Sequence, residues 1–283
     1  MRRVESIREV RAEVDNARLA GKSVGFVPTM GAFHDGHVSL MRRARADCDF
    51  VVVSIFVNPM QFDRRSDFQS YPRDEAADEE RASAERVDLL FVPSAEEMYP
   101  GGFRTRVEVE ELSGVLCGSV RPGHFGGVAT VVTKLLEIVR PDRAYFGEKD
   151  YQQLAIVGRL ARDLNLPVEI VGAPTVRESD GLAMSSRNQL LSATEREAAG
   201  VLWRALSSAR QQVEKGETDV DRLGATMRRM IGEEPLVRLE YLSIVDPKTL
   251  LDVRRVHGDV LIAVAAYVGT TRLIDNVTAS SPI

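Results

Sequence analysis

Residues 28–37, which read PTMGAFHDGH, carry the side chains best suited to chemistry. They follow an apolar run typical of a buried strand and precede an amphipathic run that predicts a helix beginning near His34. His34 and His37 are three residues apart, so they share one face of that helix. Two imidazoles at the positive N-terminal end of a helix suit a phosphate group. We therefore expect a nucleotide phosphate site here.

Two other interpretations of His34 and His37 stay open, since the pair could cap the helix or bind a metal. No third metal ligand is suggested nearby, which disfavours a metal. The segment is not a P-loop, because GxxxxGK[ST] is absent. Gly31 permits a tight turn, and Gly36 leaves room for a ligand beside the backbone.

Two later segments offer further groups for a nucleotide. The first, at residues 147–150, reads GEKD and places Lys149 as a mobile charge after a predicted strand. The second, at residues 183–188, reads AMSSRN and supplies the Arg187 guanidinium and the hydroxyls of Ser185 and Ser186. Either segment alone is typical of a surface loop. Because both segments follow the H-x-G-H segment along the chain, a shared nucleotide site is a better interpretation than two surface loops.

Strands alternate with helices for about the first 170 residues, which predicts a parallel sheet wound on both sides. The charged segment 62–86 is typical of a solvated helix. The predicted strands lie within residues 23–31, 50–58, 88–94, 143–147 and 166–176. The predicted helices cover residues 3–20, 73–86, 128–139 and 152–165, and a further helix begins near residue 34. We therefore expect an α/β fold with a Rossmann-like, doubly wound parallel sheet.

The pattern changes after about residue 175. Two amphipathic runs predict helices over residues 193–214 and 219–232, and three apolar runs predict strands over residues 240–246, 260–269 and 270–278. We place a boundary near Pro174. The expected organisation is a Rossmann-like domain over residues 1–174 and a smaller C-terminal α+β domain over residues 175–283.

Composition excludes several classes of function. The 283 residues include 37 Lys and Arg against 42 Asp and Glu, with a net charge of −5, which disfavours a general nucleic-acid binder. No apolar run approaches the length that spans a bilayer, and the N-terminus has no signal-peptide h-region. Cys48 and Cys117 match no metal spacing and are interpreted as reduced thiols. We expect a cytoplasmic protein without nucleic-acid or membrane partners.

The H-x-G-H segment and the Ser-Ser-Arg segment together resemble the HIGH-motif superfamily of class I aminoacyl-tRNA synthetases and nucleotidylyltransferases. A longer series resembles one family closely, that of the pantothenate synthetases (pantoate–β-alanine ligases). The series follows the order of the family's motifs along most of the chain. Its members are PTMGAFHDGH, FVNPMQF, YPRD, RPGHFGGV, FGEKDYQQL, VRESDGLAMSSRN and TTRLIDN.

The resemblance implies an AMP-forming ligase that joins pantoate to β-alanine. ATP is the second substrate with Mg²⁺, a pantoyl-adenylate is the intermediate, and AMP and pyrophosphate are released. The implied partners are these small molecules and a second copy of the chain in a homodimer. Residues 1–174 become the ATP- and pantoate-binding catalytic domain, and residues 175–283 become a lid.

The resemblance also assigns residues. The catalytic set is His34, His37, Lys149 and Arg187. The ATP site comprises Met30, Gly31, Ala32, Phe33, His34, Asp35, Gly36, His37, Gly147, Glu148, Lys149, Asp150, Val176, Met184, Ser185, Ser186 and Arg187. Asn58, Gln61 and Gln153 bind the pantoate and β-alanine substrates. The magnesium ligands stay unknown, because Asp78 stands in a broken acid cluster, and Arg121 and His124 receive no role.

Three rival functions stay open. A nucleotidylyltransferase acting on another small acceptor needs extra basic residues for a phosphorylated acceptor, whereas Gln61 and Gln153 suit a carboxylate. An RNA-binding, synthetase-like protein is disfavoured by the net negative charge and the lack of an anticodon-sized domain. An ATP-sensing module is disfavoured because the chain keeps both histidines, Lys149 and Arg187.

Overall fold

The chain forms two compact units in a computed structural model that describes residues 1–63 and 65–282. The first unit comprises residues 1–114, 118–148 and 153–174, and the second comprises residues 115–117, 149–152 and 175–283. Two short segments that precede Pro174 in the chain thus group with the C-terminal residues.

A six-stranded parallel sheet forms the centre of the first unit, in the order β1-β4-β3-β2-β5-β6. This arrangement confirms the expected fold class. The chain runs β2, β3, β4 toward one edge and then β5, β6 toward the other, so β2 and β5 flank the point where the order reverses. Ligands bind at such a point in parallel sheets. The strands are β1 (Arg2–Val4), β2 (Val24–Thr29), β3 (Phe50–Ile55), β4 (Leu89–Phe91), β5 (Arg143–Gly147) and β6 (Glu169–Ala173).

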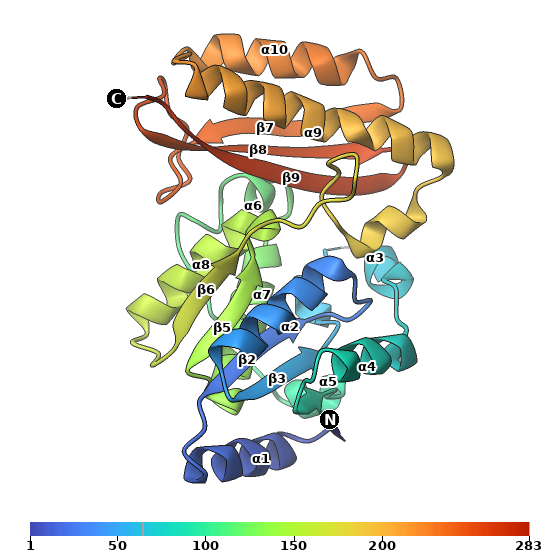
Figure 1. Cartoon of the computed structure of the whole chain (residues 1–283), viewed down its shortest axis with the longest axis vertical. Coiled ribbons are helices and arrows are strands. Elements are labelled where there is room, and N and C mark those ends of the chain that lie inside the picture. Colours follow the sequence, from blue (N-terminus) through green and yellow to red (C-terminus); the bar gives the residue numbers. More distant parts are fainter. Residues whose placement is uncertain (64, 283) are drawn as a thin grey trace. The chain divides into compact units, whose positions relative to one another are not determined.

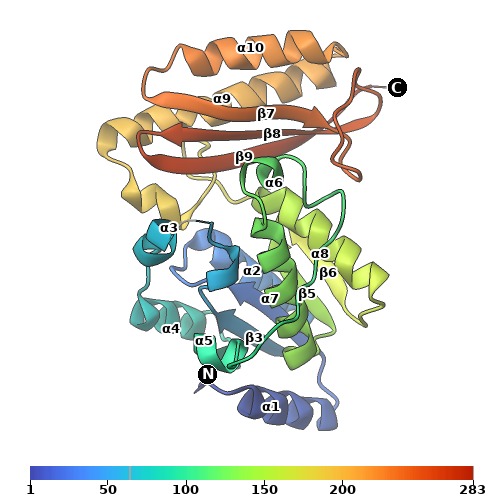
Figure 2. The same ribbon diagram turned by 180° about the vertical axis from the view of Figure 1, so that it is seen from behind.

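Helices cover both faces of this sheet, with α2 on the face toward the viewer in Figure 1 and α7 on the face toward the viewer in Figure 2. The helices are α1 (Ile7–Leu19), α2 (Asp35–Asp47), α3 (Arg65–Ser70), α4 (Glu75–Ala84), α5 (Ala95–Met98), α6 (Cys117–Val120), α7 (His124–Val139) and α8 (Tyr151–Asp163), with short 3₁₀ turns η1 (Pro59–Gln61) and η2 (Glu148–Asp150). Buried aliphatic residues of β2 and β3, among them Val27 and Val53, pack against Met41 and Ala44 of α2. This core fixes the direction of the loop that joins β2 to α2.

The N-terminus differs from the expected helix over residues 3–20. Residues Arg2–Val4 form a strand that pairs with β4, and α1 begins only at Ile7. Ser6 explains the late start, because its side chain accepts the N–H of Glu9 while the Glu9 carboxylate accepts the N–H of Ser6. Such a capping box stops a helix from extending toward the N-terminus.

The second unit packs two helices on a three-stranded antiparallel sheet of order β7-β8-β9, as expected for an α+β unit. Its elements are η3 (Ser186–Leu190), α9 (Ala193–Glu214), α10 (Val220–Gly232), β7 (Val237–Val245), β8 (Asp259–Val268) and β9 (Thr271–Ser280). Leu202 and Leu206 of α9 and Leu223 of α10 pack against the sheet, and all three are almost fully buried. Among the described residues, no helix is both long and apolar enough to cross a membrane.

Candidate active site

The loop that follows β2 is held by side chains of α4. Gly31 and Ala32 adopt the left-handed region, with φ of 83° and 52°. The carboxylate of Asp78 accepts the N–H of Ala32 at 2.8 Å and the N–H of Phe33 at 2.6 Å. Arg81 donates to the Phe33 carbonyl at 2.7 Å. Two side chains of one helix therefore fix the backbone that leads into His34.

Asp78 is only 2% exposed, although the surrounding segment reads as a solvated helix. Burial raises the pKa of its carboxyl group, and the two N–H groups of the loop oppose that rise. A Cβ atom added to Gly31 would lie 2.8 Å from an Asp78 oxygen, so only glycine allows this approach without a shift. Both carboxylate oxygens serve the loop, which gives Asp78 a role other than the magnesium ligand considered from sequence.

His34 and His37 cap the start of α2. The Nδ1 atom of His34 accepts the N–H of Gly36 at 3.1 Å, and the Nδ1 atom of His37 accepts the N–H of His34 at 3.3 Å. The ring centroids are 4.1 Å apart. An Nδ1 atom that accepts a hydrogen bond carries no proton, so each neutral ring holds its proton on Nε2. The capping interpretation is confirmed, and it defines Nε2 as the donor of both rings.

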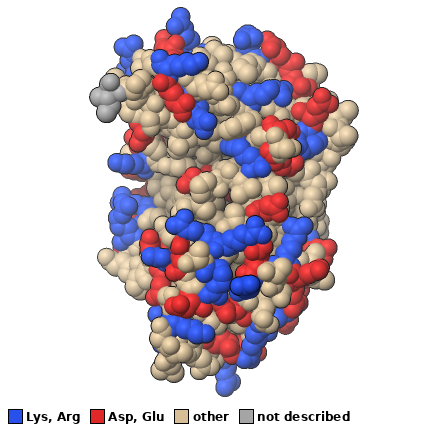
Figure 3. Space-filling model, in the orientation of Figure 1, with Lys and Arg blue, Asp and Glu red and all other residues tan. Residues whose placement is uncertain are grey.

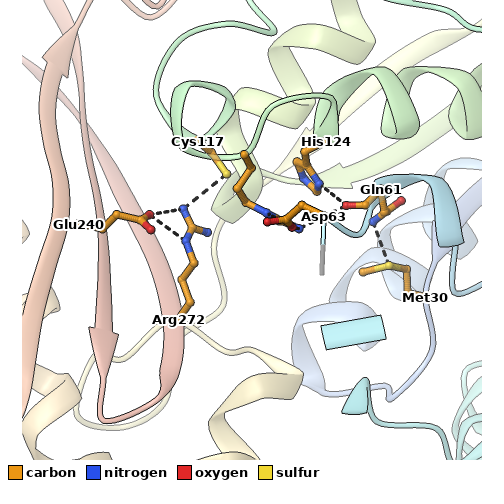
Figure 4. A network of polar contacts seen from close by, with 8 residues as sticks. Met30, Gln61, Asp63, Cys117, His124, Glu240 and Arg272 are labelled. Carbon is orange, nitrogen blue, oxygen red and sulfur yellow. Dashed lines mark hydrogen bonds and ion pairs between the residues drawn. The ribbon is translucent and has the colours of Figure 1, made fainter. Parts of the chain in front are cut away.

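The turn after β3 brings Asn58, Gln61 and Met30 together. Asn58 is 1% exposed, and its Oδ1 atom accepts the Tyr99 hydroxyl at 2.8 Å. Its amide Nδ2 donates to Gln61 Oε1 at 3.0 Å. The Gln61 amide donates to the Met30 sulfur at 3.0 Å, as Figure 4 shows. These contacts connect the turn after β3 to the loop after β2.

A cavity of about 180 Å³ lies in the first unit beside Met30 and Gly31. Ile55, Phe56 and Val57 line it from the end of β3, and the other lining residues include Phe68, Arg73, Asp74, Glu75 and Asp78. Small-molecule sites typically combine an apolar wall with a few polar groups. The cavity thus borders the start of the loop that leads from β2 to the histidines.

In the second unit, residues 176–184 form a tight hairpin. The N–H of Met184 donates to the Val176 carbonyl at 3.0 Å, and Gly181 turns the chain with a φ of 92°. The Trp203 ring covers this turn so closely that a Cβ atom on Gly181 would lie 1.9 Å from it. The Arg177 guanidinium lies over the same ring, 3.9 Å from its centroid. The hairpin is therefore packed rather than loosely exposed.

Residues Asp275 and Asn276 of β9 connect the hairpin to Lys149. Arg177 forms two hydrogen bonds with Asp275, at 2.6 and 2.9 Å, and Asp275 is 3% exposed. Burial raises the pKa of Asp275, while the Arg177 charge opposes the rise. Asn276 donates to the Lys149 carbonyl at 2.8 Å. Strand β9 thus supports two of the segments expected to bind ATP.

The Ser-Ser-Arg segment forms the start of η3. Ser185 is its N-cap and accepts the N–H of Arg187 at 3.3 Å, while Ser186 is 6% exposed. Asn188 donates to the Ala183 carbonyl at 3.2 Å and to Glu178 at 2.7 Å. The segment is therefore tied back to the hairpin that precedes it.

The remaining predicted residues lie near the ends of these elements. Gly147 ends β5, the neighbour of β2, and Glu148 begins η2. Asp150 lies 3.9 Å from the Lys149 ammonium group, and Gln153 lies half-buried in the first turn of α8. The predicted site residues divide between the units: the first contains Met30, Gly31, Ala32, Phe33, His34, Asp35, Gly36, His37, Asn58, Gln61, Gly147, Glu148 and Gln153, and the second contains Lys149, Asp150, Val176, Met184, Ser185, Ser186 and Arg187.

The family model for pantoate–β-alanine ligase matches residues 2–278, almost the whole chain. The chain belongs to the pantoate–β-alanine ligase family. It is therefore an enzyme, a ligase of pantothenate biosynthesis. The reaction of the family is the ATP-dependent condensation of pantoate with β-alanine.

Similar members of the ligase family span the same length. The pantothenate synthetase of Heliobacterium modesticaldum is 56% identical over 98% of both chains. The crystal structure of the Thermus thermophilus enzyme is 49% identical, with a TM-score of 0.93 over 98% of this chain and 99% of that one. The Francisella tularensis ligase, solved with "Beta-gamma ATP and Beta-alanine", is 35% identical, with a TM-score of 0.81 over 98% and 97% of the two chains.

The sequence did not reveal the loop-holding role of Asp78, which was considered only as a weak magnesium-ligand candidate, or the involvement of Arg81 and Tyr99 in the candidate site. Asp78 and Arg81 stand in a charged run, and nothing in that run distinguishes the buried acid from its exposed neighbours. Tyr99 lies 41 residues from its partner Asn58, so no local spacing could reveal the contact. The VRESD and RLIDN segments did resemble family motifs, and this was the one available signal for Arg177 and Asp275.

Proposed function

We propose that this chain joins pantoate to β-alanine in two steps through a pantoyl-adenylate. In the first step, a carboxylate oxygen of pantoate attacks the α-phosphorus of ATP, and the bond to the pyrophosphate oxygen breaks. In the second step, the β-alanine amine attacks the activated carbonyl carbon, and AMP leaves with the carboxylate oxygen. The amine loses one proton as the amide forms.

The observation that carries this proposal is that Nδ1 of both His34 and His37 accepts a backbone N–H group. Because Nδ1 of each ring accepts a backbone N–H, the Nε2–H groups are the donors. Fixed donors stabilise the charge that builds on phosphate oxygens during attack at phosphorus. Lys149 and Arg187 supply the positive charge in the proposal. The Francisella relative crystallised with an ATP ligand and β-alanine supports the choice of substrates.

We assign pantoate to the side-chain amides of Asn58, Gln61 and Gln153. An amide both donates and accepts hydrogen bonds without adding charge, which suits a ligand with hydroxyl groups and one carboxylate. Met30, next to Gln61, supplies apolar cover for the branched carbon skeleton. In this scheme residues 1–174 hold the substrates and residues 175–283 act as the lid that excludes water from the adenylate.

Magnesium is proposed to enter as part of the MgATP substrate. Among residues 1–63 and 65–282, no cluster of three or more His, Cys, Asp or Glu side chains suits a metal ion, and the Asp78 oxygens accept backbone N–H groups. Magnesium ions in such enzymes are held largely by phosphates and water. The Mg²⁺ concentration for half-maximal activity should therefore follow the ATP concentration. A half-maximal value that stays constant when ATP is varied would instead indicate a protein site.

The decisive test follows one oxygen atom. Pantoate labelled with ¹⁸O in its carboxylate should yield AMP that carries one ¹⁸O atom, as measured by mass spectrometry. Label in inorganic phosphate, with ADP as the product, would indicate attack at the γ-phosphorus and overturn the adenylate. Exchange of labelled pyrophosphate into ATP should also require pantoate but not β-alanine.

Paired substitutions test the histidine role. The amide nitrogen of glutamine lies about as far along the side chain as Nε2 of histidine, whereas that of asparagine matches Nδ1. His37→Gln should therefore keep more kcat than His37→Asn, which should lose about 100- to 1,000-fold, as when one transition-state donor is removed. Equal losses in the two variants would contradict an Nε2 donor.

Two family expectations stay predictions for this chain, a homodimer and a cytoplasmic location. Light scattering coupled to size-exclusion chromatography tests the first, because a dimer doubles the 31.3 kDa mass of one chain.

A further inference from the structure

The turn that carries Gln61 is weakly held by its own backbone. It is a single 3₁₀ turn, η1, in which Gln61 N–H donates to the Asn58 carbonyl at 3.3 Å and Phe62 N–H donates to the Pro59 carbonyl at 3.4 Å. Both distances are long for such bonds. Short 3₁₀ turns also have poorer hydrogen-bond geometry than α-helices. The position of Gln61 therefore depends on contacts from elsewhere in the first unit.

The first turn of α7 supplies part of that support. The Asn58 amide donates to the Gly127 carbonyl at 3.1 Å. A Cβ atom on Gly127 would lie 2.3 Å from the Met60 carbonyl oxygen, so the two backbones approach as closely as glycine allows. Helix α7 thus packs directly against η1.

Two side chains complete the support at one atom, the backbone carbonyl oxygen of Gln61. His124 Nδ1 lies 2.7 Å from this oxygen, and Arg121 Nη2 donates to it at 3.3 Å. A carbonyl oxygen only accepts hydrogen bonds, so Nδ1 of His124 must carry a proton. Figure 4 shows His124 directed at this carbonyl while the Gln61 side chain is directed at Met30.

Arg121 also fixes the end of the turn. Its Nε and Nη2 atoms donate to Asp63 Oδ1 at 3.0 and 2.7 Å, and its side chain is 14% exposed. One guanidinium therefore contacts the Gln61 carbonyl and the side chain two residues later. A planar guanidinium with several donors is well suited to this double contact.

We propose that Arg121 and His124 are positioning residues that hold Gln61 in the orientation for pantoate. They contact its carbonyl oxygen and leave its amide side chain to the substrate. The proposal rests on the assignment of Gln61 to pantoate made above. Its consequence is selective, because a displaced Gln61 weakens pantoate binding and leaves the ATP groups on His34 and His37 unchanged.

The first test compares three variants at position 124. His124→Ala removes the donor, whereas His124→Asn keeps an N–H group near the place of Nδ1, and His124→Gln moves it toward the place of Nε2. His124→Ala should raise the KM for pantoate about three- to tenfold, the worth of one hydrogen bond, with the KM for ATP unchanged. His124→Asn should recover most of this loss. If Asn is no better than Ala, or if both KM values rise equally, the proposal is wrong.

Arg121→Ala should show the same selective rise in the KM for pantoate. Arg159→Ala is the matched control, because Arg159 forms an exposed ion pair with Asp163 on α8 of the same unit. It should leave both KM values unchanged. Thermal unfolding of every variant identifies any that fail to fold.

Gln61→Ala separates failure of this inference from failure of the proposed function. If it does not change the KM for pantoate, the assignment of Gln61 is wrong. Positioning is then judged by hydrogen–deuterium exchange, which should be faster for residues 58–63 in His124→Ala than in Arg159→Ala. Unchanged exchange overturns the positioning role.

If Gln61 does bind pantoate, the effects of Gln61→Ala and His124→Ala on the KM for pantoate should be less than additive, and full additivity contradicts the inference.

Discussion

In the proposed mechanism, the side chains of His34 and His37 combine two roles that were alternatives in the sequence, helix capping and phosphate binding. As helix caps they accept backbone N–H groups through Nδ1, and this same contact places the proton of a neutral ring on Nε2. A cap that satisfies the helix end thereby sets the tautomer that the proposed phosphate contact needs. The residue types and their spacing pointed to this site, whereas the tautomer required the structure.

Asp78 gives a prediction at the same scale. In Asp78→Asn, one carboxylate oxygen becomes an NH₂ group that faces a backbone N–H, so one buried donor loses its acceptor. We expect a stability loss of about 1–3 kcal/mol, measured by denaturant unfolding, and a higher KM for ATP. Asp74→Asn is the matched control. Asp74 caps the same helix through the Ala77 N–H, and asparagine caps equally well. Equal behaviour of the two variants would count against the role of Asp78.

At the scale of elements, long periodic runs were predictable and short or tightly packed ones were not. The helices over residues 193–214 and 220–232 match the predicted ranges closely. Strand β1 has three residues, too few for a pattern. Helix α7 begins at His124 rather than 128, because Gly126 and Gly127 weaken the helical signal. A side chain at position 127 would clash with the Met60 carbonyl, and no local sequence pattern reveals this contact.

The hairpin over residues 176–184 gives a second prediction. Gly181→Ala adds a Cβ atom that overlaps the Trp203 ring and a side chain that disfavours a φ of 92°. The ring must move, which disturbs its contact with Arg177. We expect reduced kcat and a lower melting temperature. Gly216→Ala isolates the backbone effect, since its φ is 96° and no atom lies within 4 Å. That control should lose only about 1–2 kcal/mol, and a similar loss at Gly181 would exclude the steric effect.

The same hairpin should respond to acid. Arg196 contacts Asp180 and Glu178, and its hydrogen bonds lower the pKa of Asp180. A lowered pKa means that the stabilising contribution exists above the unfolded pKa, near 4, and disappears as pH falls through the folded value. The melting-temperature difference between wild type and Arg196→Gln should therefore shrink below about pH 4. A melting-temperature difference that grows as the pH falls would contradict the stabilising contact between Arg196 and Asp180.

At the scale of the whole molecule, charge is mixed rather than concentrated. Acidic and basic side chains alternate over the face drawn in Figure 3, and the net charge is −5. A general nucleic-acid binder needs a continuous basic surface. We expect no binding of a labelled 20-nucleotide RNA at low salt in a fluorescence polarisation assay. Salt-sensitive binding in the micromolar range would revive the synthetase-like alternative.

The division of the chain into two units was only partly predictable from the sequence. A change of pattern near Pro174 was visible, because helix–strand alternation ends there. Nothing in the sequence indicated that residues 115–117 and 149–152 group with the C-terminal segment. That grouping depends on distant contacts, such as the Asn276 amide with the Lys149 carbonyl and Arg272 with Cys117.

This grouping limits how relatives can be recombined. A chimera joined at residue 174 takes residues 175–283 from one parent but keeps residues 115–117 and 149–152 from the other. Strand β9 from one parent would then contact residues 117 and 149 from the other parent. A chimera that transfers the two short segments together with the C-terminal half keeps both sets of contacts from one parent. A chimera of two such ligases should therefore exchange three segments, residues 115–117, 149–152 and 175–283, instead of the last one alone.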